Sequence, residues 1–202
     1  MKKKICILNY GLGNILSLKN ALNYLGYNVV FFNKKNLNFD LLLIPGVGSF
    51  HKASTIFKKK NIFKIISNVS KNKKILGICL GMQLLMTKGY EIKASKGLNL
   101  INGEVRLIKK INNIKLPIVG YKKVKFDTKI KYLKKFNNKK FYFNHSYHVL
   151  TKNRSDNFCY SKEKKNQLIA GIKKKNILGI QFHPEKSGKV GLNFLKEIID
   201  NM

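Results

Sequence analysis

The segment 74–83 constrains the possible fold more than any other part of the chain. It reads Lys-Ile-Leu-Gly-Ile-Cys-Leu-Gly-Met-Gln, in which residues 75–78 predict a short buried strand and residues 80–86 the first turns of a helix. Glycines flank Cys79 at the turn between them, and glycine allows a tight, positive-φ backbone. The helix start beside the sulfur favours the thiolate, which is the reactive form of cysteine. This is the pattern of a nucleophile elbow with cysteine in place of serine.

A second motif lies near the C-terminus, where residues 177–182 predict a strand. Alternation along that strand puts His183 and Glu185 on the same side, with Pro184 restricting φ between them. A carboxylate beside an imidazole orients the ring and stabilises its cation. Each motif alone could be structural: a buried small residue at Cys79, and a strand end at the His-Pro-Glu sequence. Their joint presence in a chain with 4 His and 9 acidic residues favours a Cys-His-Glu triad.

Further motifs connect these two to a known family. They are Asn9-Tyr10-Gly11, Pro45-Gly46-Val47-Gly48-Ser49-Phe50, Gly77 to Leu85, His145-Ser146-Tyr147 and Gln181 to Gly188. With them the chain resembles the class I glutamine amidotransferases of the Cys-His-Glu type over nearly its whole length. The loop 45–48 and the sequence 183–188 resemble one subfamily in particular, the glutaminase subunits of imidazole glycerol phosphate synthase in histidine biosynthesis.

The resemblance implies a glutaminase that hydrolyses glutamine and passes ammonia to a (β/α)₈ cyclase subunit in a heterodimer. The products would be imidazole glycerol phosphate and an aminoimidazole carboxamide ribotide. It implies Cys79 as nucleophile, His183 as base and Glu185 as the orienting carboxylate. No metal and no organic cofactor are implied, and glutamine is the substrate.

The resemblance also assigns supporting roles. Oxyanion stabilisation falls to Val47, Gly48 and Leu80. Glutamine binding falls to Gly46, Gln83, Glu91, Ser146 and Tyr147, and the partner interface to Tyr121 and Lys186. Independently of the family, the spacing of four residues puts Gln83 on the same helix face as Cys79. Two departures weaken single assignments: loop 87–96 lacks the usual acidic stretch around Glu91, and residues 119–121 are Val-Gly-Tyr where the family usually has Met-Gly-Trp.

Strands and helices are expected to alternate in the first half of the chain. Strands are expected at 5–9, 28–32, 40–44 and 75–78, and helices at 15–25, 57–69 and 80–86. This order predicts an α/β fold with a doubly wound, mostly parallel or mixed sheet flanked by helices, flavodoxin-like in type. The active site is then expected at the carboxyl ends of the strands, where loop 45–48 and the elbow lie.

From residue 104 onward the expected strands are short and alternating. They fall at 105–109, 122–126, 141–149, 167–172 and 177–182, before a last helix at 190–199. They predict a smaller, antiparallel, strand-rich part laid against the first half. No linker or repeat divides the chain, so residues 1–202 are expected to form a single amidotransferase domain.

The formal net charge of +32 is extreme and could indicate nucleic-acid binding. Of the 41 basic residues, however, only Arg106 and Arg154 are arginines, whereas base and phosphate recognition relies heavily on arginine. The lysines are spread along the whole chain. We therefore expect no specific nucleic-acid partner, only weak polyanion binding at low salt.

The chain has 3 cysteines, which argues against a disulfide framework and for a reducing compartment. The first apolar run, residues 5–8, is too short for a signal peptide, and no stretch approaches a membrane span. A cytoplasmic protein without membrane association is expected.

Two alternatives to the imidazole glycerol phosphate synthase assignment stay open. One is the glutaminase subunit of another pathway, such as pyridoxal phosphate or anthranilate synthesis, against which the Val47 loop and the sequence 186–188 argue. The other is a basic binding protein on a decayed amidotransferase fold, against which the intact triad argues.

Overall fold

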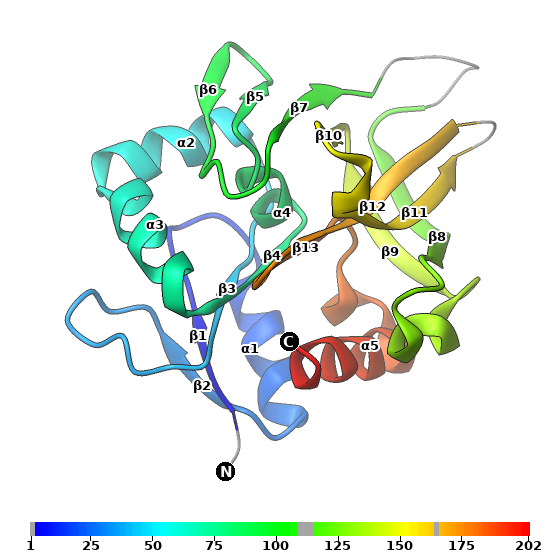
Figure 1. The fold of residues 1–202 in the computed structure, drawn as a ribbon, viewed down its shortest axis with the longest axis horizontal. Coiled ribbons are helices and arrows are strands. Elements are labelled where there is room, and N and C mark those ends of the chain that lie inside the picture. Colours follow the sequence, from blue (N-terminus) through cyan, green and yellow to red (C-terminus); the bar gives the residue numbers. More distant parts are fainter. Residues whose placement is uncertain (1–2, 109–114, 164–165) are drawn as a thin grey trace.

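The computed structural model describes residues 3–108, 115–163 and 166–202. Helices alternate with strands in the first half, and strands dominate the second (Figure 1). The helices are α1 (Ile15–Tyr24), α2 (Phe50–Lys59), α3 (Ile62–Asn72), α4 (Leu80–Leu84) and α5 (Gly188–Asp200), with 3-10 helices at Lys131–Phe136, Arg154–Asp156 and Pro184–Lys186. The strands are β1 (Lys4–Ile7), β2 (Asn28–Phe31), β3 (Leu41–Ile44), β4 (Lys74–Ile78), β5 (Lys88–Tyr90), β6 (Ala94–Lys96), β7 (Gly103–Leu107), β8 (Ile118–Phe126), β9 (Lys140–His145), β10 (Tyr147–Thr151), β11 (Asn157–Glu163), β12 (Asn166–Lys174) and β13 (Ile177–Ile180).

The main sheet has the order β2-β1-β3-β4-β13-β12-β11-β8-β9. Its first part, from β2 to β13, is parallel, and from β12 to β9 each strand runs antiparallel to its neighbour. A second sheet, β10-β7-β5-β6, lies beside it. The predicted doubly wound, mixed α/β sheet is therefore confirmed, and most of the antiparallel strands of the second half continue that sheet.

Alternating apolar side chains give the sheet two buried faces. Ile5 and Ile7 of β1 belong to the cluster covered by α1 and α5. Cys6 and Leu8 point the other way, into the cluster covered by α2 and α3. Figure 1 shows the two helix pairs on opposite sides of the strands. This buried sheet holds the carboxyl ends of β3 and β4 side by side, in register from Leu41 and Lys74 onward.

The prediction of a single helix over 57–69 is wrong, because two helices, α2 and α3, occupy this region. Helix α2 begins at Phe50, where Ser49 caps it by accepting a hydrogen bond from the Lys52 amide, and it ends at Lys59. Helix α3 starts only after Asn61, which has a φ of 57°. Asparagine is one of the few residues that adopt this left-handed conformation, so it can break the helix without glycine.

Several other boundaries differ from the sequence prediction. The run 141–149 is divided into β9 and β10 at Ser146, and β13 ends at Ile180 rather than at residue 182. The predicted strand 105–109 ends at Leu107 in β7, and residue 109 lies outside the described residues. The division at Ser146 and the early end of β13 both place polar residues at the carboxyl edge of the sheet.

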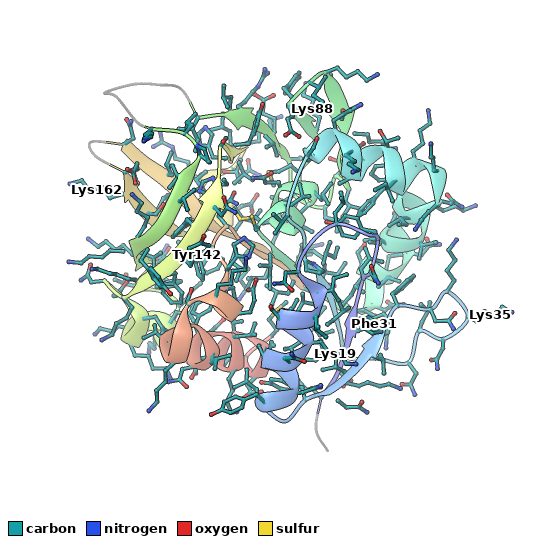
Figure 2. All side chains as sticks on the ribbon, turned by 180° about the vertical axis from the view of Figure 1, so that it is seen from behind. Lys19, Phe31, Lys35, Lys88, Tyr142 and Lys162 are labelled. Carbon is teal, nitrogen blue, oxygen red and sulfur yellow. The ribbon has the colours of Figure 1, made fainter. Side chains whose placement is uncertain are left out.

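The lysine side chains cover the molecule on many sides. Figure 2 shows Lys35, Lys88 and Lys162 at widely separated edges. This distribution agrees with solvated surface charge rather than one basic groove. In the described part of the chain, no helix combines the length and hydrophobicity needed to span a membrane.

Candidate active site

Cys79 lies at the turn between β4 and α4 with φ 54° and ψ −109°. This conformation is strained for a residue with a Cβ. A side chain at Gly81 would collide with the carbonyl of Ile44, and one at Gly77 with the backbone of Gly81. The Cys79 amide donates to the carbonyl of Ile180, 2.8 Å away, which ties the turn to β13. The predicted elbow is thus present, with both glycines required by close backbone approach.

His183 and Glu185 meet just after β13. The Nδ1 atom of His183 and Oε1 of Glu185 are 2.8 Å apart, and both side chains are almost fully buried. Their contact was predicted from strand alternation, but the strand has already ended. Pro184 instead begins the 3-10 helix that turns Glu185 back onto the ring. The buried Nε2 atom of His183 has no hydrogen-bond partner in the structure, so it is free for proton transfer.

Electrostatics favour a charged imidazole at His183. Burial alone would lower its pKa, because a cation is poorly solvated in the interior. The negative charges of Cys79 and Glu185 outweigh burial and raise the pKa of His183 to about 10. The surroundings of His183 therefore favour its charged form, held beside Glu185 and Cys79.

A cleft of about 250 Å³ opens over the sulfur. Its lining includes Val47, Gly48, Cys79, Leu80, Gln83, Glu91, Pro117, Asn144, His145, Ser146 and Tyr147. These residues come from loop 45–48, the elbow with α4, the segment before β6, the residue before β8 and the β9–β10 break. The cleft brings together most of the residues assigned from the sequence to the oxyanion and to glutamine. Gly46 lies just behind this wall, where a side chain would collide with the buried hydroxyl of Tyr10.

Loop 45–48 is held at its first residue. The Tyr10 hydroxyl donates to the carbonyl of Pro45 at 2.8 Å. Three residues later there is free space: Gly48 has a φ of 120°, and a Cβ built on it meets no atom within 4 Å. Loop 45–48 thus combines a fixed start with a sterically open end.

The comparisons with known proteins identify the family of the chain. The family model for glutamine amidotransferase class-I matches residues 6–200. Imidazole glycerol phosphate synthase subunit HisH 2 of Methanococcus maripaludis is 37% identical over 200 residues, covering 96% of this chain and 98% of that protein. The HisH subunit of Carboxydothermus hydrogenoformans is 40% identical over 196 residues, covering 95% of this chain and 96% of that protein. The chain belongs to the class-I glutamine amidotransferases.

Solved amidotransferase structures share its fold. The structure of PurLQS from Thermotoga maritima superposes with a TM-score of 0.75 at 17% identity, covering 100% of this chain and 99% of that chain. A glutamine amidotransferase from the same organism gives a TM-score of 0.65 at 16% identity, covering 100% and 84%. The fold and the family predicted from the motifs are both confirmed.

The Glu91 carboxylate of this amidotransferase is already engaged. Its Oε2 atom accepts from the Ser49 hydroxyl at 2.7 Å and from the His51 amide at 3.4 Å, at the start of α2. The Tyr147 hydroxyl donates to the Glu91 backbone carbonyl at 3.3 Å. Glu91 therefore connects α2 to Tyr147 at the rim of the cleft. These contacts hold Glu91 beside the cleft although the loop around it lacks the usual acidic residues.

The residues assigned to the partner face of the amidotransferase lie together on the surface. Tyr121 is 55% exposed and Val119 is 53% exposed. The Tyr121 hydroxyl donates to the backbone carbonyl of Lys186 at 3.1 Å. Because Lys186 ends the 3-10 helix that carries Glu185, this exposed ring is bonded directly to the segment that holds the triad carboxylate.

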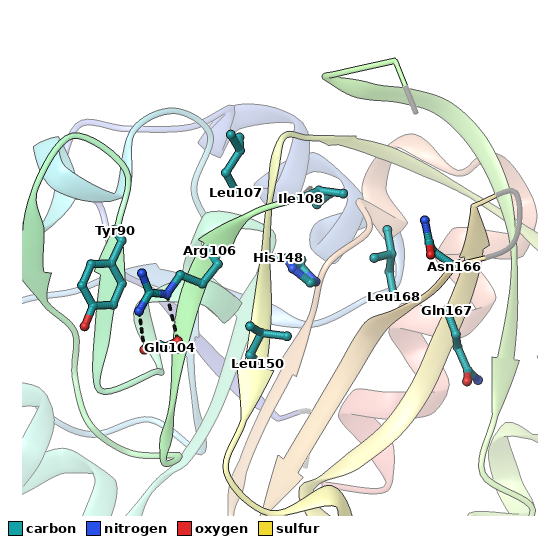
Figure 3. Close-up of a pocket in the computed structure, with 10 residues that line it drawn as sticks. All are labelled: Tyr90, Glu104, Arg106, Leu107, Ile108, His148, Leu150, Asn166, Gln167 and Leu168. Atoms are coloured by element: carbon teal, nitrogen blue, oxygen red, sulfur yellow. Dashed lines mark hydrogen bonds and ion pairs between the residues drawn. The ribbon is translucent and has the colours of Figure 1, made fainter. Parts of the chain in front are cut away.

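A larger hollow, of about 710 Å³, lies elsewhere on the amidotransferase, between β7, β10 and β12 (Figure 3). Arg106 and Glu104 pair on the same strand, β7, at 2.8 Å, with the guanidinium 3.5 Å from the centre of the Tyr90 ring. It contains no thiol, so we assign the chemistry to the smaller cleft. Among the described residues, no three His, Cys, Asp or Glu side chains gather in a way that could hold a metal ion.

Several residues of the amidotransferase site were not assigned in the sequence analysis: Pro117, Asn144 and His145 line the cleft, and Gln181 contacts the sulfur. Gln181 is fully buried, and its Nε2 atom lies 3.5 Å from the Cys79 sulfur. Strand alternation had placed Gln181 on the same side as His183. The alternation therefore indicated that Gln181 lies on the side of the active site, but it could not predict its contact with the Cys79 sulfur.

Proposed function

We propose that this chain is the glutaminase subunit of an imidazole glycerol phosphate synthase. It would hydrolyse glutamine to glutamate and ammonia and pass the ammonia to a (β/α)₈ cyclase subunit. The observation that carries the proposal is the cleft lined by Cys79, with the buried His183–Glu185 pair close enough to this cysteine for Cys79 to raise the pKa of His183. The HisH names of its relatives support the choice of pathway.

The proposed reaction uses the charged pair directly. The Cys79 thiolate attacks the side-chain amide carbon of glutamine, and the C=O bond becomes a C–O⁻ group. The imidazolium of His183 gives its proton to the leaving nitrogen, so the C–N bond breaks and ammonia departs. This leaves a γ-glutamyl thioester. A water molecule then attacks it while His183 takes the water proton and passes it to the sulfur, which releases glutamate.

The remaining site residues have supporting roles in this proposal. Backbone N–H groups of Val47, Gly48 and Leu80 stabilise the oxyanion. Gly46, Gln83, Glu91, Ser146 and Tyr147 hold the glutamine. Residues 1–202 act as one domain, and no bound cofactor takes part.

The cyclase subunit is proposed to dock on the face around Tyr121 and Lys186 as the second half of a heterodimer. An exposed aromatic ring beside a cation is suited to such an interface. The ammonia would be used to form imidazole glycerol phosphate and an aminoimidazole carboxamide ribotide. Free thiols at all three cysteines fit a cytoplasmic enzyme, which is the proposed location.

A glutamine-mimicking diazoketone tests the proposal. Burial raises the pKa of Cys6 to about 12 and raises that of Cys159 well above its usual range, so both stay protonated. Only Cys79 combines a cleft with a base, and peptide mapping should find the label there alone. Equal labelling of Cys6 or Cys159 would contradict the assignment.

A further inference from the structure

A chain of three hydrogen bonds connects the rim of the cleft to the proposed nucleophile. The Nε2 atom of Gln83 donates to the backbone carbonyl of Tyr147 at 3.0 Å and to Oε1 of Gln181 at 3.1 Å. The Nε2 atom of Gln181 donates in turn to the Cys79 sulfur at 3.5 Å. Both glutamine side chains are buried, and that of Gln181 is completely so.

The Tyr147 carbonyl fixes which atoms donate and which accept in all three hydrogen bonds. A carbonyl can only accept, so Gln83 must turn its amino group toward Tyr147. The Nδ1 atom of His145 also donates to this carbonyl, at 2.8 Å. The second hydrogen of the Gln83 amino group then requires an acceptor at Gln181, which must present its oxygen. Gln181 is left with its amino group facing the sulfur.

We propose that Gln181 is the hydrogen-bond donor to the reacting sulfur of Cys79, held in that orientation by Gln83 and the Tyr147 carbonyl. This inference rests on the proposed function, because it concerns the same nucleophile. A donor beside the sulfur stabilises the thiolate before attack and again when the thioester breaks. A further polar contact of the sulfur favours the opposite state: the Asn144 carbonyl, 3.9 Å away, can only accept from a neutral thiol.

The same bonds restrict what Gln83 can offer to a substrate. Both hydrogens of its amino group are used, toward Tyr147 and Gln181. Only its Oε1 atom remains to face a ligand, and that atom accepts. Gln83 is therefore assigned to an N–H donor of the substrate, such as the ammonium group of glutamine, and not to its carboxylate.

The test is the pH dependence of Cys79 alkylation by iodoacetamide on the full chain, with modification followed by peptide mapping. Gln181→Met keeps the side-chain length and removes the donor. The pH at half-maximal alkylation is expected to rise by about one unit, which is about tenfold slower alkylation well below the midpoint. At high pH, where the thiolate no longer needs the donor, the variant and the wild type should react equally fast.

Two further variants complete the test. Gln181→Glu places an acceptor beside the sulfur and should move the midpoint upward at least as far. Gln83→Met removes the bond that orients the Gln181 amide, so the pH at half-maximal alkylation should rise by a smaller amount. This variant also provides the test if the Gln181 variants fail to fold. The matched control is Gln167→Glu, the same change at an exposed glutamine on β12, which should leave the midpoint in place.

The outcomes separate this inference from the proposed function. A midpoint in Gln181→Met equal to that of the wild type would overturn the role of Gln181 and leave the glutaminase proposal standing. Faster alkylation of that variant at every pH would also overturn it, because that result signals a loosened site. Wild-type Cys79 reacting no faster than Cys6 and Cys159 would instead overturn the proposed function.

Discussion

The backbone N–H of Leu80 donates a hydrogen bond to the carbonyl of Gly46, with 3.3 Å between the two heavy atoms. Leu80 directly follows the proposed nucleophile, so its N–H is one of the groups expected to stabilise the oxyanion. In this arrangement it is engaged by loop 45–48. The loop must shift before Leu80 can serve, and the open space around Gly48 makes a peptide rotation sterically possible.

We therefore expect the cyclase subunit to gate glutamine hydrolysis through this loop. The isolated chain should turn over glutamine about 10²–10³ times more slowly than the complex with a liganded cyclase, which is the value of one oxyanion donor. The partner must favour the rotated loop, since a ligand shifts an equilibrium only by its differential affinity. Steady-state glutaminase assays with and without the cyclase and its ligand measure this ratio. A lone chain already at the full rate would exclude the gate.

Gly48→Ala tests where that gate lies. A Cβ at Gly48 has room, but a φ of 120° costs an alanine about 1–3 kcal/mol. This strain destabilises the resting loop, so the basal rate of the isolated chain should rise and the activation ratio should fall, without a loss of cyclase affinity. The matched control is Gly26→Ala, which strains a φ of 84° after α1, away from the cleft. Normal activation of the Gly48 variant would place the gate elsewhere.

Tyr121 is expected to transmit partner binding to the triad. Tyr121→Phe keeps the exposed ring but loses the bond to the Lys186 carbonyl, at the end of the 3-10 helix that carries Glu185. We expect unchanged cyclase affinity and an activated glutaminase rate about two- to tenfold lower, as the loss of one hydrogen bond implies. Tyr24→Phe, at a tyrosine 81% exposed on α1, is the control. A loss of affinity with a normal rate in the saturated complex would contradict this account.

Stability should depend on pH through His183. Its pKa is about 10 in the folded chain, against about 6.5 in the unfolded chain. A raised pKa contributes stability that is complete below the unfolded value and lost as pH rises through the folded value. Glu185→Gln weakens this effect, so it should lower the free energy of unfolding by roughly 1–3 kcal/mol at pH 6 and by progressively less toward pH 10.

Urea unfolding at several pH values measures this difference. The control is Glu163→Gln, which breaks the more exposed ion pair of Glu163 with Lys122, whose atoms are 2.7 Å apart. Its cost should stay below about 1 kcal/mol and change little between pH 6 and pH 9. A cost of Glu185→Gln that stayed the same from pH 6 to pH 10 would contradict a charged His183 in the folded chain.

Local sequence patterns were sufficient for the elbow and for the parallel sheet. The elbow at Cys79 and the position of Gln83 on the following helix depend only on residues close in sequence, so both could be predicted from the local pattern. The contact of His183 with Glu185 was predicted for a different reason from the one observed. Strand alternation suggested it, whereas the 3-10 helix begun by Pro184 produces it.

Relations between distant segments could not be read in the same way. The bond of Leu80 to Gly46 and that of Gln181 to Cys79 depend on how loops from different strands meet, which no single pattern encodes. The helix break at Asn61 was missed because apolar spacing continues across it, and only the backbone conformation of one residue interrupts it. The roles given to the cleft residues stay predictions that the experiments above address.

The central claim, that Cys79 is the nucleophile of a glutaminase that feeds a cyclase, is tested most directly by Cys79→Ala in the presence of the cyclase subunit. The measurement is synthesis of imidazole glycerol phosphate with glutamine and, separately, with ammonium salts as the nitrogen source. We predict that glutamine-dependent synthesis falls by at least about 10³-fold, because the thioester cannot form, while ammonium-dependent synthesis is retained. Loss of both activities together, or retention of the glutamine-dependent one, would contradict the account.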